Sequence, residues 1–162
     1  MSSLKFLADS MLGTLARRLR LLGIDTVYPG NAEESQLKYV ARSQDRVLLT
    51  RDLKLARSLG PSAWLVSGGD VREEFLSIAA NLSSLRSQIN PLSRCLDCND
   101  HLLSMDPGQA EGRVPPYILQ SKSTFSRCPS CGKVFWEGTH SEKMGEEVAW
   151  MRRMLEEFGD GG

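Results

Sequence analysis

The sequence predicts an α/β fold in which helices flank a parallel sheet, followed by a small zinc-binding module and a terminal helix. Over the first 90 residues, short apolar runs typical of buried strands alternate with helical apolar patterns. This alternation indicates parallel strands joined by right-handed helical crossovers. Beyond residue 90 the pattern changes to two Cys-x-x-Cys pairs and then an amphipathic run at 141–158.

Four short strands are expected, each within or at the end of an apolar run. The runs are LKFLAD at 4–9, TVY at 26–28, RVLLT at 46–50 and SAWLVS at 62–67. Nearly continuous apolar composition suits strands that are buried on both faces of a parallel sheet. Pro29-Gly30 closes the second strand with a turn.

Helices are expected between and after these strands, at 10–23, 33–43, 53–59 and 71–89. The first would place Arg17 and Arg20 on the face opposite its apolar stripe, and Gly23 at its C-cap. That stripe consists of Met11, Leu12, Leu15, Ala16, Leu19 and Leu22. The fourth helix carries an apolar stripe about five turns long, from Val71 to Ile89.

Three aspartates follow predicted strands. Asp9, Asp52 and Asp70 stand at or just after strand carboxyl ends, where open parallel sheets bind ligands. Clustered carboxylates repel one another unless a cation neutralises them, and Mg²⁺ or Mn²⁺ is the usual partner of oxygen ligands. Glu34, in the first turn of the second helix, adds a fourth carboxylate. The cations expected to contact phosphate beside this edge are Arg17, Arg18, Arg51 and Lys54.

Each of these residues also has a purely structural interpretation. Aspartate after a strand is a favoured helix N-cap, and Asp9 and Asp52 both precede helices. A glutamate in a first helical turn complements the helix dipole. The arginines of the first helix also fit a solvated helix face. The pattern alone leaves both interpretations open.

The four cysteines form two Cys-x-x-Cys pairs, separated by 29 residues. Paired thiolates at this spacing predict one tetrahedral structural zinc, with Cys95, Cys98, Cys128 and Cys131 as ligands. The alternatives are a redox dithiol or free buried thiols. A redox pair would open a helix after a strand, and neither pair does so. Zinc is expected to replace a hydrophobic core in this short polar segment.

Composition neither supports nor excludes a nucleic-acid partner. The formal net charge is +0, and residues 1–93 carry 12 Lys and Arg against 9 Asp and Glu. We expect a cytoplasmic protein without a membrane segment, because no secretory leader or long apolar run occurs. The terminal helix carries a stripe from Met144 to Phe158, which should cover the body of the protein or a second copy.

Three stretches together resemble one known family. They are KFLADSMLGTLARRLRLLGIDTVY, RVLLTRD and SRCLDCN…FSRCPSCGKVFWEGTHSEKM. The sequence is similar over about residues 4–145 to the Mut-seven C-terminal RNase domain family, in which a PIN-like nuclease domain precedes a zinc ribbon. The domains implied are a PIN-like α/β nuclease domain at 1–90, a zinc ribbon at 91–140 and an amphipathic helix at 141–162.

The resemblance also implies a site. Asp9 matches the family's aspartate after the first strand, and Asp52 that of its T-R-D motif. Glu34 matches the acidic residue that opens the second helix, and Asp70 loosely matches a later acidic position. The implied activity is cleavage of RNA, single-stranded in our expectation, with Mg²⁺ or Mn²⁺ bound by Asp9, Asp52 and Asp70.

Two other classes of function are alternatives. One is a non-catalytic RNA-binding or adaptor module with a degenerate PIN-like site, in which the zinc ribbon does the recognition. The other is a phosphoacceptor receiver-like domain, which also uses aspartates after its first and third strands. That chemistry needs a fifth strand that ends in a lysine, whereas this chain enters the cysteine segment instead. A metal-dependent ribonuclease is the expected function.

Overall fold

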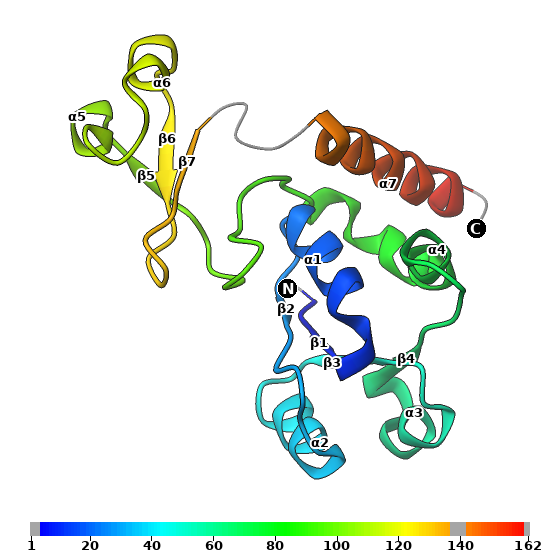
Figure 1. The fold of residues 1–162 in the computed structure, drawn as a ribbon. Coiled ribbons are helices and arrows are strands. Elements are labelled where there is room, and N and C mark those ends of the chain that lie inside the picture. Colours follow the sequence, from blue (N-terminus) through cyan, green and yellow to red (C-terminus); the bar gives the residue numbers. More distant parts are fainter. Residues whose placement is uncertain (1–3, 137–141, 161–162) are drawn as a thin grey trace.

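The first half of the chain alternates strands and helices, in a computed structural model that describes residues 4–136 and 142–160 (Figure 1). The strands are β1 (Phe6–Ala8), β2 (Thr26–Val27), β3 (Val47–Thr50) and β4 (Ala63–Leu65). The helices are α1 (Gly13–Leu21), α2 (Glu34–Ser43), α3 (Leu53–Leu59) and α4 (Val71–Leu82). Short 3₁₀ turns are η1 (Ser10–Leu12), η2 (Gly60–Ser62) and η3 (Ser83–Gln88). We call residues 4–89 the α/β body.

The four strands form one parallel sheet in the order β2-β1-β3-β4. Because all strands run the same way, their carboxyl ends lie at one edge. Ala8 pairs with Leu49, so the residues that follow them, Asp9 and Thr50, stand side by side at that edge. This confirms the predicted fold class.

Helices cover both faces of the sheet. On one face α1 and α4 pack against Phe6, Ala8 and Leu49, and on the other α2 and α3 pack against Leu7 and Leu48. The strand side chains therefore alternate between two apolar cores, and all five of these residues are fully buried. This explains why the strand sequences are apolar without interruption.

Two details of the helices differ from the sequence prediction. The run at 10–23 begins as a 3₁₀ turn, which leaves Met11 49% exposed although Leu12 is fully buried. The run at 71–89 leaves the α-helix at Leu82, where Ser83 and Ser84 donate hydrogen bonds to the carbonyls of Ala80 and Asn81. Such hydroxyl bonds compete with the helical ladder.

Residues 91–136 form a second unit, which we call the cysteine lobe. Its antiparallel sheet has the order β5-β6-β7, with β5 (Leu103–Met105), β6 (Phe125–Arg127) and β7 (Val134–Trp136). Between β5 and β6 lie two short helices, α5 (Pro107–Ala110) and α6 (Pro116–Ser121), which the sequence prediction did not include. They cover a small core around Met105, Phe125 and Val134.

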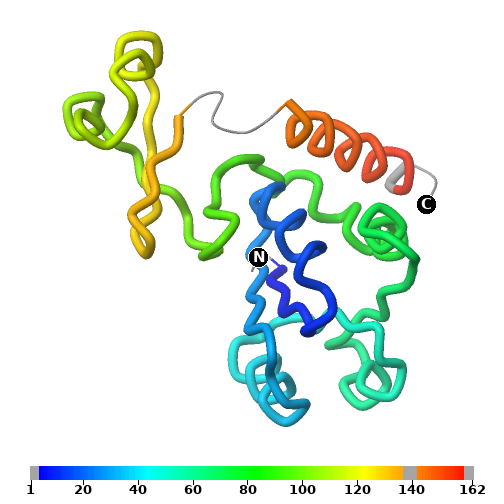
Figure 2. Tube along the Cα trace, in the orientation of Figure 1, coloured from blue at the N-terminus to red at the C-terminus, as the bar shows by residue number. Residues whose placement is uncertain are grey.

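The terminal helix α7 (Glu142–Asp160) packs on α4 and η3 of the same chain (Figures 1 and 2). Met151 and Leu155 are each 1% exposed within the core of the α/β body. Trp150 packs on Phe75, with ring centroids 5.8 Å apart, and the Arg72 guanidinium lies 4.5 Å from the Trp150 ring. The apolar stripe therefore covers the body of its own chain, the first of the two arrangements expected.

None of the helices within the described ranges has both the length and the apolar composition that crossing a membrane requires.

Candidate functional site

Asp9 occupies the carboxyl end of β1 and is 6% exposed. One carboxylate oxygen accepts a hydrogen bond from the Ser10 amide at 2.7 Å, and the other accepts one from the Thr50 hydroxyl at 2.7 Å. Asp9 forms no ion pair with any residue that the structure describes. A buried carboxylate without a cation is unfavourable, so this position suits a positively charged ligand.

Asp52 lies at the same edge, two residues after β3 ends. Its amide donates to the Thr50 hydroxyl at 3.0 Å, so this hydroxyl joins Asp52 to Asp9. One carboxylate oxygen caps α3 by accepting from the amides of Lys54 and Leu55, at 3.0 and 3.1 Å. Asp52 is exposed, and its carboxylate keeps acceptor capacity for a ligand.

Asp70 and Glu34 stand on the rim rather than in the interior. Asp70 is exposed and caps α4 by accepting from the Glu73 amide at 2.8 Å. Glu34 opens α2 and pairs with Lys38, with Oε1 and Nζ 3.1 Å apart. Asp9, Asp52 and Asp70 therefore all cap helices, as the structural interpretation predicts for Asp9 and Asp52.

The carboxylates along this edge do not gather into a compact ligand set. Among the described residues, one group of three or more possible metal ligands has all its ligand atoms within 4.8 Å of one another. That group is the four cysteines. Thr50 links Asp9 to Asp52, whereas no described interaction links either of them to Asp70 or Glu34.

The four cations expected near phosphate differ in their surroundings. Arg17 pairs with Asp97 of the cysteine lobe at 2.5 Å, and its hydrogen bond holds the pKa of Asp97 below its ordinary value. Arg51 pairs with Glu74 in the first turn of α4 at 3.0 Å. Lys54 is exposed. Arg18 is half-buried, and its buried Nε has no hydrogen-bond partner among the described residues.

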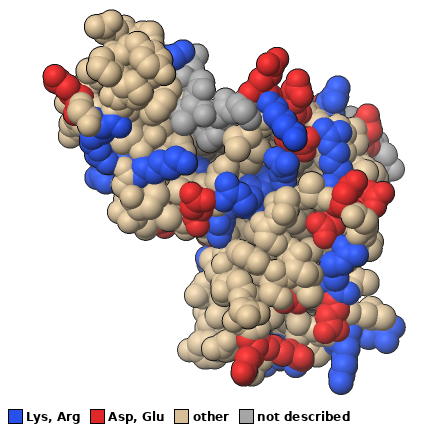
Figure 3. All heavy atoms as spheres, in the orientation of Figure 1, with Lys and Arg blue, Asp and Glu red and all other residues tan. Residues whose placement is uncertain are grey.

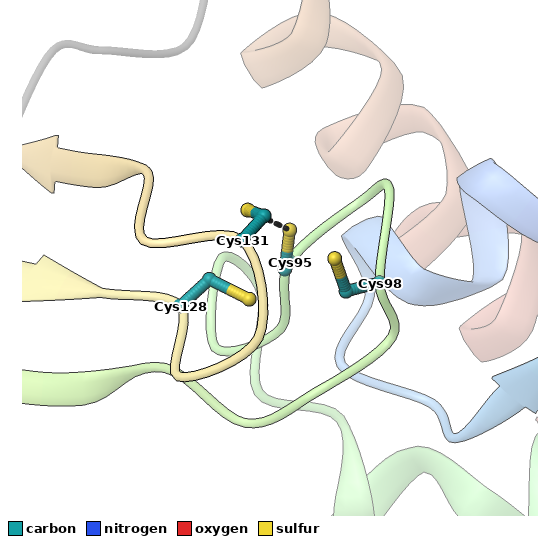
Figure 4. Close-up of side chains that lie close together, drawn as sticks. All are labelled: Cys95, Cys98, Cys128 and Cys131. Carbon is teal, nitrogen blue, oxygen red and sulfur yellow. Dashed lines mark hydrogen bonds between the residues drawn. The ribbon is translucent and has the colours of Figure 1, made fainter.

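The four cysteines converge on one point from two loops (Figure 4). Cys95 and Cys98 come from the loop that leads into β5, and Cys128 and Cys131 from the turn between β6 and β7. All four are free thiols, and the Sγ atoms of Cys95 and Cys131 lie 3.9 Å apart. A tetrahedral zinc with Zn–S bonds of about 2.3 Å needs sulfurs about 3.8 Å apart. The cluster fits zinc.

The electrostatics of the cluster also favour a cation. Burial raises the pKa of Cys95. Burial, together with hydrogen bonds to the other thiols and the negative charge of Cys95, raises the pKa of Cys98 to about 12. Burial alone would raise the pKa of Cys128 as well, but hydrogen bonds from the Cys131 and Ser130 amides and from neighbouring thiols lower it. Because the pKa values of Cys95 and Cys98 are raised, four thiolates do not coexist at neutral pH unless a bound cation offsets their repulsion. The structure thus confirms that the four cysteines come together in an arrangement that could bind zinc.

A buried polar network that the sequence did not reveal docks the first cysteine loop on the α/β body. The Arg20 guanidinium, expected on a solvated face, is buried and donates to the carbonyls of Thr26 and Leu96 at 2.9 and 2.7 Å. Asn99 accepts from the Thr26 amide at 3.0 Å and donates to Asp25 at 2.7 Å. These bonds satisfy the free edge of β2, which would otherwise be open to strand addition.

Asp25 is the charged centre of this network. Burial alone would raise its pKa, but hydrogen bonds from Arg46 and Asn99 bring the pKa of Asp25 below its ordinary value. Arg46 and Asp25 lie 2.8 Å apart, with only 10% and 23% of their side chains exposed. A polar depression of about 600 Å³ opens over this network and reaches Arg94 and His101. Its three arginines are all engaged in hydrogen bonds with neighbouring residues.

Fold and site together define a class: an α/β protein with acidic residues at the carboxyl edge of a parallel sheet and an appended four-cysteine metal site. The model of one family, described as Mut7-C RNAse domain, matches residues 4–148. The chain therefore belongs to the Mut7-C RNAse domain family, which confirms the resemblance seen in the sequence. A search of curated proteins and a search of solved structures give no significant match.

Membership in this family suggests a nuclease-like function with RNA as the substrate. The match runs through the cysteine lobe and ends within α7.

Proposed function

We propose that this chain is a metal-dependent ribonuclease whose active site is the carboxyl edge of the parallel sheet. The observation that carries the proposal is Asp9, a buried carboxylate without a described ion-pair partner, joined through Thr50 to Asp52. Helix capping accounts for one oxygen of each aspartate but not for the burial of Asp9. The proposed domains are a PIN-like nuclease domain at 1–90, a zinc ribbon at 91–140 and a helix at 141–162.

The proposed catalytic residues are Asp9, Glu34, Asp52 and Asp70. Asp9 and Asp52 would hold Mg²⁺ or Mn²⁺ with their oxygens, which are the ligands these hard cations prefer. Such an ion supplies Lewis-acid stabilisation of the charge that develops on a phosphodiester, and it lowers the pKa of water. Asp70 and Glu34 are the carboxylates available to a second ion or to orient water, because both stand exposed at the rim.

Single-stranded RNA is the proposed substrate, contacted by Arg17, Arg18, Arg51 and Lys54. Lys and Arg side chains gather over the junction between the α/β body and the cysteine lobe on the face shown in Figure 3. The Arg17–Asp97 ion pair joins α1 to the lobe at this junction, so RNA bound by these cations would also lie against the lobe. Zinc would be held by the four cysteines, whose free thiols suit a reducing compartment such as the cytoplasm.

A non-catalytic RNA-binding module remains the second candidate, because a specific observation favours it. The oxygens of Asp9, Asp52 and Asp70 do not form a compact group like that of the cysteines. In that case the aspartates would serve as helix caps, and the basic junction would carry the function.

The test is cleavage of a labelled single-stranded RNA by zinc-loaded protein supplied with Mn²⁺. Asp9→Asn and Asp52→Asn preserve capping, because Asn caps about as well as Asp, but remove the charge that holds the ion. We expect both variants to stay folded and to lose nearly all activity. Asp45→Asn is the matched control, since Asp45 is exposed and has a φ of 53° that asparagine accepts. Cleavage by Asp52→Asn at the wild-type rate would refute the proposal.

A further inference from the structure

The outer face of α2 carries a tyrosine that packing does not explain. Tyr39 is 71% exposed, the most exposed of the large apolar and aromatic side chains in the described residues. The opposite face of α2 buries Leu37 and Ala41 against the sheet, so the fold needs nothing from Tyr39. A large aromatic side chain held in solvent on a rigid helix is a suitable stacking surface.

The surface beside Tyr39 is hollowed on both sides. A mostly uncharged depression of about 470 Å³ lies against Pro29, Asn31, Gln36 and Tyr39. The side-chain oxygen of Gln36 accepts a hydrogen bond from the backbone amide of Glu33 at 3.1 Å. This bond fixes the Gln36 side chain and leaves its NH₂ group as a donor. Amide side chains beside an aromatic ring can bind the edge of an unstacked base while the ring stacks on its face.

On the other side of Tyr39 the surface becomes basic. A second depression of about 520 Å³ is lined by Ser35, Lys38, Tyr39 and Arg42. These residues follow the i, i+3, i+4, i+7 spacing of one helical face. Arg42 is exposed and forms no ion pair with any described residue. An unpaired cation one turn from an exposed ring complements the alternating bases and phosphates of a single strand.

We propose that this face of α2 is a nucleobase-binding subsite for single-stranded RNA, with Tyr39 stacking on a base and Arg42 contacting the adjacent phosphate. The proposal rests on the proposed ribonuclease function and extends it to a defined part of the substrate. The Lys38–Glu34 ion pair joins this surface to the acidic residue that opens α2. RNA bound here would thus lie beside Glu34, one of the proposed catalytic carboxylates.

The test is the affinity of a fluorescent oligouridine for the zinc-loaded full chain in EDTA-free buffer with Ca²⁺ in place of Mn²⁺, measured by anisotropy. Tyr39→Ala should weaken binding about 5- to 150-fold, the range for the loss of one stacked base, whereas Tyr39→Phe should keep it. Arg42→Ala should reduce the slope of log K against log[salt] by about 0.7, because one phosphate contact is lost. Tyr117→Ala is the matched control, because Tyr117 is 68% exposed on α6 of the cysteine lobe.

A direct readout accompanies the affinities. An oligonucleotide carrying 4-thiouridine should photocrosslink to the peptide that contains Tyr39, and mass spectrometry identifies that peptide. Equal affinities of wild type and Tyr39→Ala, with crosslinks elsewhere, would overturn the subsite while leaving Mn²⁺-dependent cleavage intact. If wild-type protein bound no RNA at all, the subsite and the proposed function would fall together. If this face of α2 binds a protein instead of RNA, Tyr39→Ala would bind RNA as tightly as wild type, and the crosslinks would lie elsewhere.

Discussion

Thr50 joins the two carboxylates on which the proposed activity depends. Its hydroxyl donates to Asp9 and accepts from the Asp52 amide, and its side chain is fully buried. One hydroxyl therefore fixes the orientation of Asp9 and the backbone that presents Asp52. The residue acts through its neighbours, so we regard Thr50 as a positioning residue.

Replacing Thr50 with valine keeps the shape of the side chain but removes both hydrogen bonds. We expect Thr50→Val to lower the free energy of unfolding by about 1–3 kcal/mol, because buried polar partners are left unsatisfied. Cleavage should fall roughly tenfold or more, since the carboxylates lose their fixed geometry. Urea denaturation and a Mn²⁺ cleavage assay measure the two effects. Thr50→Ser keeps the hydroxyl and should keep both the stability and the cleavage rate close to wild type. If Thr50→Ser were as impaired as Thr50→Val, the hydroxyl of Thr50 would not be what positions the carboxylates.

The lowered pKa of Asp25 makes the stability of the folded protein depend on pH. Its pKa is lower in the folded protein than the unfolded value of about 3.9, so its stabilisation is complete above that value. It is lost as the pH falls through the folded pKa. At pH 6 the free energy of unfolding of wild type should therefore exceed that of Asp25→Asn. This difference should shrink as the pH falls from about 4 toward the folded pKa of Asp25. Chemical denaturation of both proteins across this range checks the prediction; a constant difference would contradict it.

The residue scale also shows what sequence could and could not predict. The positions of Asp9 and Asp52 at strand carboxyl ends could be predicted, because strand ends are readable from apolar runs. Asp70 was also expected just after a strand, but β4 ends at Leu65, before the Gly68-Gly69 turn. Arg20 was misassigned to solvent, because its carbonyl partner at Leu96 lies 76 residues away in the chain. Asn99 gave no signal for the same reason: its partners are the Thr26 amide and Asp25.

At the scale of elements, the cysteine loop and the edge strand β2 depend on each other. Asn99 follows the first cysteine pair directly and bonds the Thr26 amide on the free edge of β2. Zinc that orders this loop would therefore also protect the edge of the sheet. The lobe is a structural neighbour of the α/β body as well as a proposed RNA-binding unit.

Metal removal should expose this dependence. We expect one tightly held zinc per chain, and after chelation the Thr26 amide should exchange with deuterium much faster. Structural zinc contributes about 10–16 kcal/mol of apparent binding free energy in small domains, so the loop should not stay ordered without it. Asn99→Gly should speed Thr26 exchange while the zinc content stays at one, because glycine accepts the φ of 69°. Unchanged exchange after chelation would refute the coupling.

The terminal helix α7 contributes to stability through side chains that its apolar stripe buries. Met151→Ala should lower the free energy of unfolding by about 2–5 kcal/mol, because Met151 is 1% exposed. Arg152→Ala, on the exposed side of the same turn, should change it by less than about 0.5 kcal/mol. Thermal or urea unfolding of the two variants measures these changes. If both substitutions had equally small effects on the free energy of unfolding, α7 would not pack on the α/β body in solution.

The sequence predicts a helix or strand well where apolar periodicity determines its position. It predicts poorly those ends of helices that local hydrogen bonds determine. The four strands, the three crossover helices α1, α2 and α3, and the later helices α4 and α7 all follow from apolar spacing. The end of α4 at Leu82 depends on serine hydroxyls, which hydropathy does not register. The helices α5 and α6 escaped prediction, because short proline-capped turns carry little periodicity.

In the whole molecule, the two proposed metal sites lie in different parts of the fold. The proposed oxygen ligands follow the carboxyl ends of β1 and β3, whereas the four cysteines lie in the lobe docked on α1 and the edge of β2. Hard cations prefer the first and zinc the second. We therefore propose a structural zinc at the cysteines and a catalytic Mg²⁺ or Mn²⁺ at Asp9 and Asp52.

The measurement that tests this assignment most directly is an anomalous-scattering map from crystals of the zinc-containing protein soaked in Mn²⁺. Data on either side of the zinc and manganese absorption edges identify each element by position. We expect a zinc peak among the four Sγ atoms and a manganese peak within about 2–2.5 Å of carboxylate oxygens of Asp9 and Asp52. A manganese-free carboxyl edge in crystals of protein that still cleaves RNA would contradict the central claim.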